Sequence, residues 1–181
     1  MSTQSWQFGS ESGDLEILTG VSGPAARLGH RLTIAVPTWT AEVSWQDDIP
    51  VTASLAGSLD SLVVIRGEGG ATPLTAPEKT VARSNALKAL DAKKFPTFAF
   101  RSDHIQRTES GYRMVGVLEL HGESRAQTVD VDVTQNDQEF TMGAHVEVVQ
   151  SDYGIKPFAM VLGALRVADA VTIQFAATYH P

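Results

Sequence analysis

The five histidines are the side chains that could most readily hold a metal ion or transfer a proton. They are His30, His104, His121, His145 and His180. No two of them have the HxH or HExxH spacing that brings metal ligands together, so a metal site would need ligands from separate strands. His145 lies opposite the apolar face of an alternating segment, and His121 lies at a turn. Both are interpreted as surface or structural residues, and no metal site is expected.

A second group with chemical potential is Ser151-Asp152-Tyr153, which combines a hydroxyl, an acid and a phenol. A nucleophilic serine of the hydrolase type lies in a GxSxG turn, which is missing here. Ser-Asp at the end of a strand is common in turns, where both side chains bond the backbone. The pattern favours a structural turn. A catalytic Asp152–Tyr153 pair is the alternative.

Composition limits the classes of partner. The 181 residues suit one domain, 1–181, that buries its own core. The absence of cysteine excludes disulfides and thiolate ligands. The net charge of −7 argues against nucleic acid or an anionic bilayer as a constant partner, because both need a basic surface. No apolar run approaches the roughly 18 residues of a membrane span, and no signal-peptide pattern begins the chain, so we expect a cytoplasmic protein.

Alternation of apolar and polar residues, the pattern of β-strands, runs through most of the chain. It is clear at 15–21, 32–36, 39–45, 112–120, 129–133, 140–148 and 171–179. Residues 1–13 are expected to form a flexible N-terminal segment. Pro37, where the parity of the alternation changes, suggests an edge or a bulge rather than a break between two strands. Some eight or nine antiparallel strands leave two all-β architectures, a sandwich and a closed barrel.

One α-helix is predicted among the strands, at about residues 77–91. Thr75 and Glu78 have the spacing of a capping box, and a proline lies in the first turn, where its missing N–H costs nothing. Apolar residues then recur at helical spacing until Phe95-Pro96 stops the pattern. We therefore expect one inserted helix in an otherwise all-β chain.

Three stretches occur in order along the chain: AKKFPTFAFRS at 92–102, GVLELHG at 116–122 with Arg125 beyond it, and QSDYGI at 150–155. Together they resemble the successive motifs of the YceI family, over about residues 28–178. The resemblance implies a lipocalin-like antiparallel eight-stranded β-barrel whose lumen binds a polyisoprenoid chain. It implies no cofactor beyond an isoprenoid or quinone-type lipid held as ligand. The segment from Val51 to Glu78 resembles a variant subgroup. Many members are exported, so without a signal-peptide pattern we expect a cytoplasmic variant.

In such a barrel the inward face of the strands would bind the ligand. The residues expected there are Phe98, Phe100, Met114, Leu118, Met142, Val146, Phe158, Met160, Leu162 and Phe175. His30 matches a family position at the start of an early strand, where it would meet a ligand headgroup or, more commonly, make a structural hydrogen bond. The same side chains would also suit a filled core, because alternation does not distinguish a lumen from an outer layer.

Two functions remain open at this point. The first is a non-enzymatic carrier or sequestering protein for an apolar, isoprenoid-type lipid. The second is a barrel enzyme, an isomerase or hydrolase, that uses His30 or the Asp152–Tyr153 pair on such a substrate. In neither is nucleic acid a partner.

The stretch 150–169 resembles a strand that breaks, extends a mostly apolar arm over 155–165 and becomes a strand again. Gly154 and Pro157 would let the chain leave the sheet, and Gly163 would let it return. The arm is interpreted either as a lid at the barrel mouth or as a contact in a homodimer, because large exposed apolar patches are uncommon on monomers.

Overall fold

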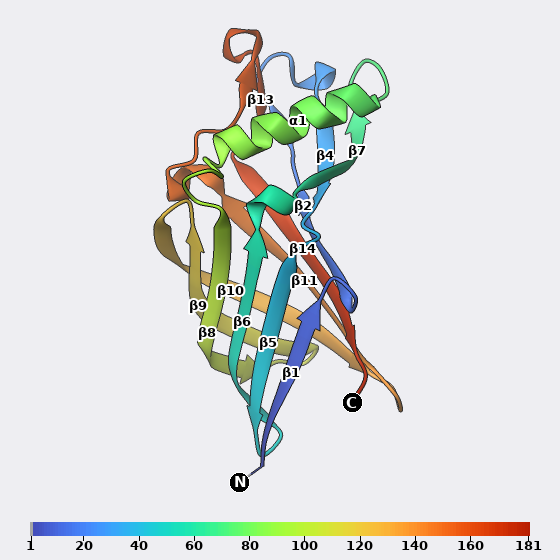
Figure 1. Cartoon of the computed structure of the whole chain (residues 1–181), viewed down its shortest axis with the longest axis vertical. Coiled ribbons are helices and arrows are strands. Elements are labelled where there is room, and N and C mark those ends of the chain that lie inside the picture. Colours follow the sequence, from blue (N-terminus) through green and yellow to red (C-terminus); the bar gives the residue numbers. More distant parts are fainter. Residues whose placement is uncertain (1) are drawn as a thin grey trace.

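The computed structural model describes residues 2–181 and contains two antiparallel sheets and one α-helix (Figure 1). The strands are β1 (Thr3–Gly9), β2 (Gly13–Leu18), β3 (Val21–Ser22), β4 (His30–Ala35), β5 (Trp39–Gln46), β6 (Ile49–Ser58), β7 (Val63–Gly69), β8 (Thr97–Arg107), β9 (Gly111–Leu120), β10 (Glu123–Gln135), β11 (Phe140–Val149), β12 (Ala159–Met160), β13 (Leu165–Val167) and β14 (Ala170–Tyr179). The helices are α1 (Ala76–Ala89) and the short 3-10 helices η1 (Ala26–Leu28), η2 (Leu59–Ser61), η3 (Gln150–Tyr153) and η4 (Val161–Gly163).

The larger sheet has 11 strands in the order β1-β5-β6-β8-β9-β10-β11-β14-β2-β4-β7 and curls into a barrel. Three pairs of consecutive strands, β1/β2, β4/β5 and β6/β7, each act as one bent strand of the barrel. One member of each pair belongs to the hydrogen-bonded series β1–β5–β6, and the other member belongs to the series β2–β4–β7. From β6 the pairing continues through β8, β9, β10 and β11 to β14, and β14 pairs with β2. Counting each of these pairs as one bent strand gives eight strands around the barrel. The predicted all-β antiparallel barrel is therefore confirmed, although more separate strands form it than expected.

The bend between β4 and β5 lies at Val36-Pro37-Thr38, which belongs to no strand. The prediction that Pro37 marks an edge position or a bulge rather than a break between two strands is therefore wrong. Proline has no N–H to donate to a ladder. Its neighbours bond elsewhere: the N–H of Val36 donates to Leu15 O at 2.8 Å, and the N–H of Thr38 donates to Ser61 Oγ at 3.2 Å.

The N-terminal segment is also structured where the sequence predicts flexibility. Within residues 1–13, strand β1 pairs along its whole length with β5, so the expectation of a flexible segment is wrong there. Trp6 and Phe8 alternate into the core and are 8% and 6% exposed, whereas Gln7 between them is exposed. This alternation buries enough apolar surface to order the strand.

Strand β14 ends near the C-terminus, at the end of the barrel away from α1 (Figure 1), and four aromatic rings pack together around its last residue, Tyr179. Trp6 stacks on Tyr179 with ring centroids 4.2 Å apart, and the centroids of Trp45 and Phe140 lie 4.6 and 4.8 Å from that of Trp6. These four rings, here called the aromatic floor, join β1, β5, β11 and β14. They therefore link the first and last strands of the barrel through side-chain packing.

Helix α1 begins one residue before the predicted start and ends two residues before the predicted end. Its capping box is present: the N–H of Glu78 donates to Thr75 Oγ1 at 3.4 Å, and the N–H of Thr75 donates to Glu78 Oε2 at 2.7 Å. The hydrogen bonds from Thr75, first from its hydroxyl and then from its backbone, hold the pKa of the Glu78 carboxyl below its usual value.

Replacing Thr75 with Ala should lower the free energy of unfolding by about 1 kcal/mol, because the N-cap is lost. Denaturant unfolding measures this loss, and Ser84→Ala on the exposed face of the same helix is the control.

A carboxyl whose pKa is lowered on folding stabilises the protein above about pH 4.5, and this contribution disappears as the pH falls through the lowered value. Wild type should therefore exceed Glu78→Gln in stability above that pH and converge with it in stronger acid. An equal difference at every pH would contradict the capping role.

Candidate functional site: an apolar cavity in the barrel

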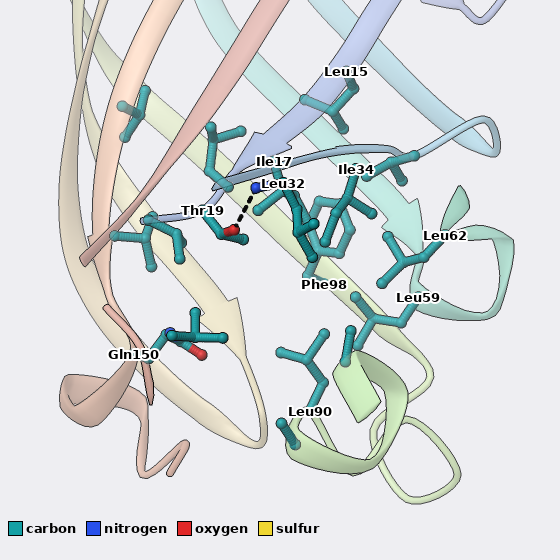
Figure 2. Close-up of a pocket in the computed structure, with 18 of the residues that line it drawn as sticks. Leu15, Ile17, Thr19, Leu32, Ile34, Leu59, Leu62, Leu90, Phe98 and Gln150 are labelled. Carbon is teal, nitrogen blue, oxygen red and sulfur yellow. Dashed lines mark hydrogen bonds between the residues drawn. The ribbon is translucent and has the colours of Figure 1, made fainter. Parts of the chain in front are cut away.

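A cavity of about 700 Å³ lies inside the barrel and extends to α1, which lines it in part (Figure 2). Its volume falls in the range of small-molecule sites in proteins. Figure 2 shows side chains from several strands and from the α1 region converging on one space: Leu15, Ile17, Leu32, Ile34, Leu59, Leu62, Leu90 and Phe98. The lumen is thus open in this structure rather than filled by its own side chains.

Strand alternation and two glycines position the walls of the cavity. In β2, Leu15 and Ile17 line the cavity and Glu16 between them does not. In β8, Phe98 and Phe100 line it, and each ring lies against the backbone of a glycine on a neighbouring strand. A Cβ on Gly57 would lie 2.3 Å from Phe98 Cζ, and one on Gly116 would lie 2.8 Å from Phe100 Cζ. Glycine at these positions keeps both rings close to the wall.

Helix α1 covers the end of the cavity opposite the floor. Its lining residues recur at helical spacing: Pro77, Glu78, Val81, Ala82, Asn85, Ala86, Ala89 and Leu90. None of the helix residues is fully buried: Ala82 and Leu87 pack against the barrel core, and the rest of the lining face meets the cavity. Arg83 fastens the helix to the barrel: its Nε donates to Leu62 O at 2.7 Å, and its Nη2 donates to Asp60 O. The helix is therefore a fixed cover rather than part of a solid core.

Polar side chains in the lining are few. Thr19 Oγ1 accepts the N–H of Leu32 at 3.0 Å, the dashed bond in Figure 2, and Gln150 Nε2 donates to Ala168 O at 2.9 Å. Ionisable lining residues of the described chain lie only at the open end: His30, Glu78 and Arg166. Because a charge without a partner is costly in an apolar interior, this lining suits an uncharged apolar ligand.

The opening of the cavity is marked by lining residues that remain exposed. Eight of the nine come from three segments, 20–32, 63–90 and 154–168, which we call the mouth segments. The eight are Leu28, Ala71, Thr72, Pro77, Glu78, Val81, Met160 and Arg166. The opening is therefore framed by η1, by α1 with the loop before it, and by the β12–β13 hairpin.

The predicted arm over residues 155–165 contains most of that hairpin. Strand β12 pairs with β13, and β13 pairs with β3. Two more backbone bonds, from Ala25 N–H to Ala164 O and from Ala168 N–H to Gly20 O, are each 2.9 Å long. In Figure 1 the hairpin rises beside α1 at the open end of the barrel. The arm is thus an ordered rim of the opening, anchored to the segment before β4.

Ten of the eleven side chains predicted to bind ligand line the cavity. They are His30, Phe98, Phe100, Met114, Leu118, Met142, Val146, Phe158, Met160 and Phe175. Leu162 is the exception: its relative exposure is 109%, and it contributes nothing to the lining. Val161 and Leu162 have φ of 51° and 54°, a left-handed turn at the tip of the hairpin, where Leu162 extends into solvent. The prediction for Leu162 is wrong, and ligand binding by the other ten stays a prediction.

His30 makes a structural hydrogen bond. Its Nε2 lies 2.7 Å from Thr72 O, and because a carbonyl only accepts, this nitrogen carries the proton and donates. The bond ties the start of β4 to the loop that precedes α1. A Cβ on Gly70 would lie 2.4 Å from the same nitrogen, so glycine makes room for the ring.

Sequence reasoning missed one side of the cavity. Leu15 and Ile17 of β2, Leu32 and Ile34 of β4, and the apolar face of α1 all line it. The alternation at 15–21 and 32–36 contained this signal, and so did the helical spacing after Thr75. The motifs that carry the resemblance lie between residues 92 and 155. The residues expected to line the cavity, apart from His30, also lie in this second half of the chain.

The Ser151-Asp152-Tyr153 group lies outside the cavity lining. The N–H of Ser151 donates to Asp169 Oδ1 at 2.8 Å, and its hydroxyl donates to Asp169 Oδ2 at 2.5 Å. Tyr153 is 3% exposed in a small apolar cluster, and this burial raises the pKa of its phenol. These contacts fit the structural turn expected from the sequence. Across residues 2–181, no three potential metal-ligating side chains of His, Cys, Asp or Glu come together.

No helix in the described chain has the length and apolar character needed to cross a membrane.

Similar folds occur in solved structures. Burkholderia cenocepacia BcnA has 17% sequence identity, a TM-score of 0.68, and coverage of 92% of this chain and 96% of its own. The Campylobacter jejuni YCEI protein has 11% identity, a TM-score of 0.61 and coverage of 82% and 84%. A mutant CJ YCEI protein solved with a monobromobimane guest has 12% identity and a TM-score of 0.62 over the same shares.

At these identities the structural likeness shows a shared fold. A search of curated protein sequences found no match. The sequence pattern of one family does extend over most of the chain, from the start of β4 to the end of β14. Because the YceI-like domain model matches residues 31–179, the protein belongs to the YceI-like family, as the resemblance of its motifs predicts.

Proposed function

We propose that the protein binds a long apolar lipid, of the polyisoprenoid type, in the barrel cavity and carries or sequesters it without chemical change. The observation that carries the proposal is the cavity of about 700 Å³, which has aliphatic and aromatic walls and is open at one end. Membership of the YceI-like family supports this class of ligand.

The free energy available in such a cavity is large. Each buried methylene contributes roughly 0.8 kcal/mol, so one five-carbon isoprenoid unit supplies about 4 kcal/mol before the cost of ordering the chain. Three methionines in the lining, Met114, Met142 and Met160, have flexible side chains that adapt to an irregular ligand. Tight binding therefore requires no charged group inside the barrel.

Binding is favoured over catalysis by the positions of the ionisable groups. His30 is engaged with Thr72 O, and Glu78 belongs to the cap of α1. The Asp152–Tyr153 pair lies outside the lining, so it would not reach a ligand in the cavity. No observation therefore favours the enzymatic alternative, and binding is the function that we propose.

Native mass spectrometry of the purified protein tests this proposal. We expect a copurified apolar ligand at one per chain, or, after delipidation, uptake of an added polyprenol at the same ratio. A linear fatty alcohol of equal carbon number is the control, and the branched chain should bind more tightly. Equal binding of both would contradict the isoprenoid class, and no uptake of any apolar chain would overturn the binding function.

A further inference from the structure

The charge of the protein is divided unequally along the barrel. The mouth segments contain eight of the 14 lysines and arginines but only two of the 21 aspartates and glutamates, a balance of +6. The remainder of the chain has six basic and 19 acidic residues, a balance of −13. The net charge of −7 therefore describes an acidic protein in which the mouth segments, which frame the cavity opening, are basic.

The same end exposes apolar side chains. Met160, Val161 and Leu162 at the tip of the β12–β13 hairpin are 48%, 64% and 109% exposed, and Leu28 on η1 is 53% exposed. Arg27 lies beside Leu28 and is exposed as well. Strand β13 pairs with β3, which leads into η1, so the hairpin and η1 lie next to each other on one rim.

The tip is held in an unusual backbone conformation. Val161, Leu162 and Gly163 are consecutive left-handed residues with φ of 51°, 54° and 86°. This region is unfavourable for a β-branched side chain such as valine. The bond from Ala164 N–H to Val161 O, 3.0 Å, closes the turn and keeps Leu162 directed into solvent. Strain of this kind is concentrated at functional sites in proteins.

We propose that the mouth segments dock on the surface of an anionic lipid bilayer. Val161 and Leu162 would enter the interface, and the exposed cations Arg27, Lys156 and Arg166 would lie against the headgroups. Exposed apolar residues combined with basic residues are the features that bind proteins to anionic membrane surfaces without spanning them. A second copy of the chain is a poorer partner for this surface, because it would bring two basic ends together.

Docking in this orientation turns the cavity opening towards the bilayer. The residues that test it differ from those of the proposed function, because Leu162 and Arg27 do not line the cavity, whereas Arg166 does and is left unchanged in the tests. The two proposals can therefore fail separately. Membrane docking is measured without reference to the cavity ligand, and ligand uptake is measured without a membrane.

Vesicle flotation of the full chain tests the docking surface. Wild type should bind vesicles that contain phosphatidylglycerol, bind pure phosphatidylcholine vesicles weakly, and dissociate as the salt concentration rises. Leu162→Ser should weaken binding by roughly tenfold or more, because one leucine no longer leaves water. Ile49→Ser, at an exposed apolar residue that begins β6 near the floor, is the matched control and should change binding less than twofold.

A charge reversal provides the second pair of variants. Arg27→Glu should also weaken binding to phosphatidylglycerol vesicles by roughly tenfold or more, because each cation near an anionic surface contributes to binding. Arg107→Glu makes the same charge change at the far end of β8 and should have little effect. Equal losses in both variants would mean that net charge alone controls binding, and this would overturn the proposed surface.

The absence of cysteine allows a direct readout of insertion. An environment-sensitive fluorophore on Leu162→Cys should shift to shorter wavelength with phosphatidylglycerol vesicles, and the same label on Ile49→Cys should not. This measurement also covers the case in which a serine variant folds poorly. No shift at position 162, or a dimer in sedimentation that Leu162→Ser converts to a monomer, would overturn membrane docking and assign the tip another role.

Discussion

An Ala86→Trp variant is expected to bind an apolar chain at least about tenfold more weakly than wild type while it keeps its fold. Ala86 is on the face of α1 that lines the cavity, and it is only partly buried because that face meets open space. An indole there would occupy volume that the ligand needs. Displacing even two buried methylenes costs about 1.6 kcal/mol, which is more than tenfold in affinity.

Ser84→Trp is the matched control for this variant. Ser84 is in the same helix, is exposed and does not line the cavity, so the same indole there should leave ligand uptake unchanged. Circular dichroism and unfolding curves of both variants would show that α1 remains intact. If both variants bind the ligand as wild type does, the ligand does not occupy the cavity beneath α1.

Replacing Trp6 with Ala is expected to lower the free energy of unfolding by about 3–5 kcal/mol, a typical loss for a buried Trp or Phe. The Trp6 ring packs among Trp45, Phe140 and Tyr179 and is 8% exposed. Domains of this size have about 5–15 kcal/mol of stability in total, so the loss would be a large fraction of it. Denaturant unfolding followed by circular dichroism measures the change.

Two further variants define the cause of that loss. Gln7→Ala, on the exposed face of β1, should change stability by no more than about 0.5 kcal/mol. Trp6→Phe should cost much less than Trp6→Ala, because the indole N–H is buried without a hydrogen-bond partner in the described structure, and its removal breaks no bond. Unchanged stability in Trp6→Ala would mean that β1 contributes nothing to the core.

The strands and the helix could be predicted because their signals are local, whereas the expectation of a barrel rather than a sandwich came from the resemblance to the YceI family. Alternation in β9, β10, β11 and β14 follows directly from strand geometry. The start of α1 follows from Thr75 and Glu78, whose side-chain and backbone groups satisfy each other within one turn. Such signals need no knowledge of the rest of the chain.

The bends and the cavity could not be predicted in the same way. Pro37 marks a change of parity, but whether the wall continues beyond it depends on the pairing of β4 with β2 and of β5 with β1, far away in sequence. Phe98 would face inward in a filled or an open barrel alike. The difference arises from Gly57, which lets the ring lie against the wall, and from α1, which spans the opening without filling it.

The mouth segments show that the average composition of a chain does not predict the character of a local surface. A net charge of −7 argues against an anionic surface as partner, yet the fold brings three basic segments, separated in sequence, to one end. Leu162 likewise belongs to an apolar stretch, and only the left-handed turn at the tip separates it from Met160, which lines the cavity. Both features depend on tertiary structure.

Strand β1 starts and β14 ends beside the aromatic floor, at the pole of the barrel farthest from α1 (Figure 1). A tag, a surface tether or a fused domain attached at either terminus would therefore lie at the end of the barrel away from α1. The cavity opening at the α1 end would stay unobstructed. Immobilised copies would share one orientation, with their openings facing the surrounding solution. The topology thus makes the molecule suitable for display on a support without redesign of its termini.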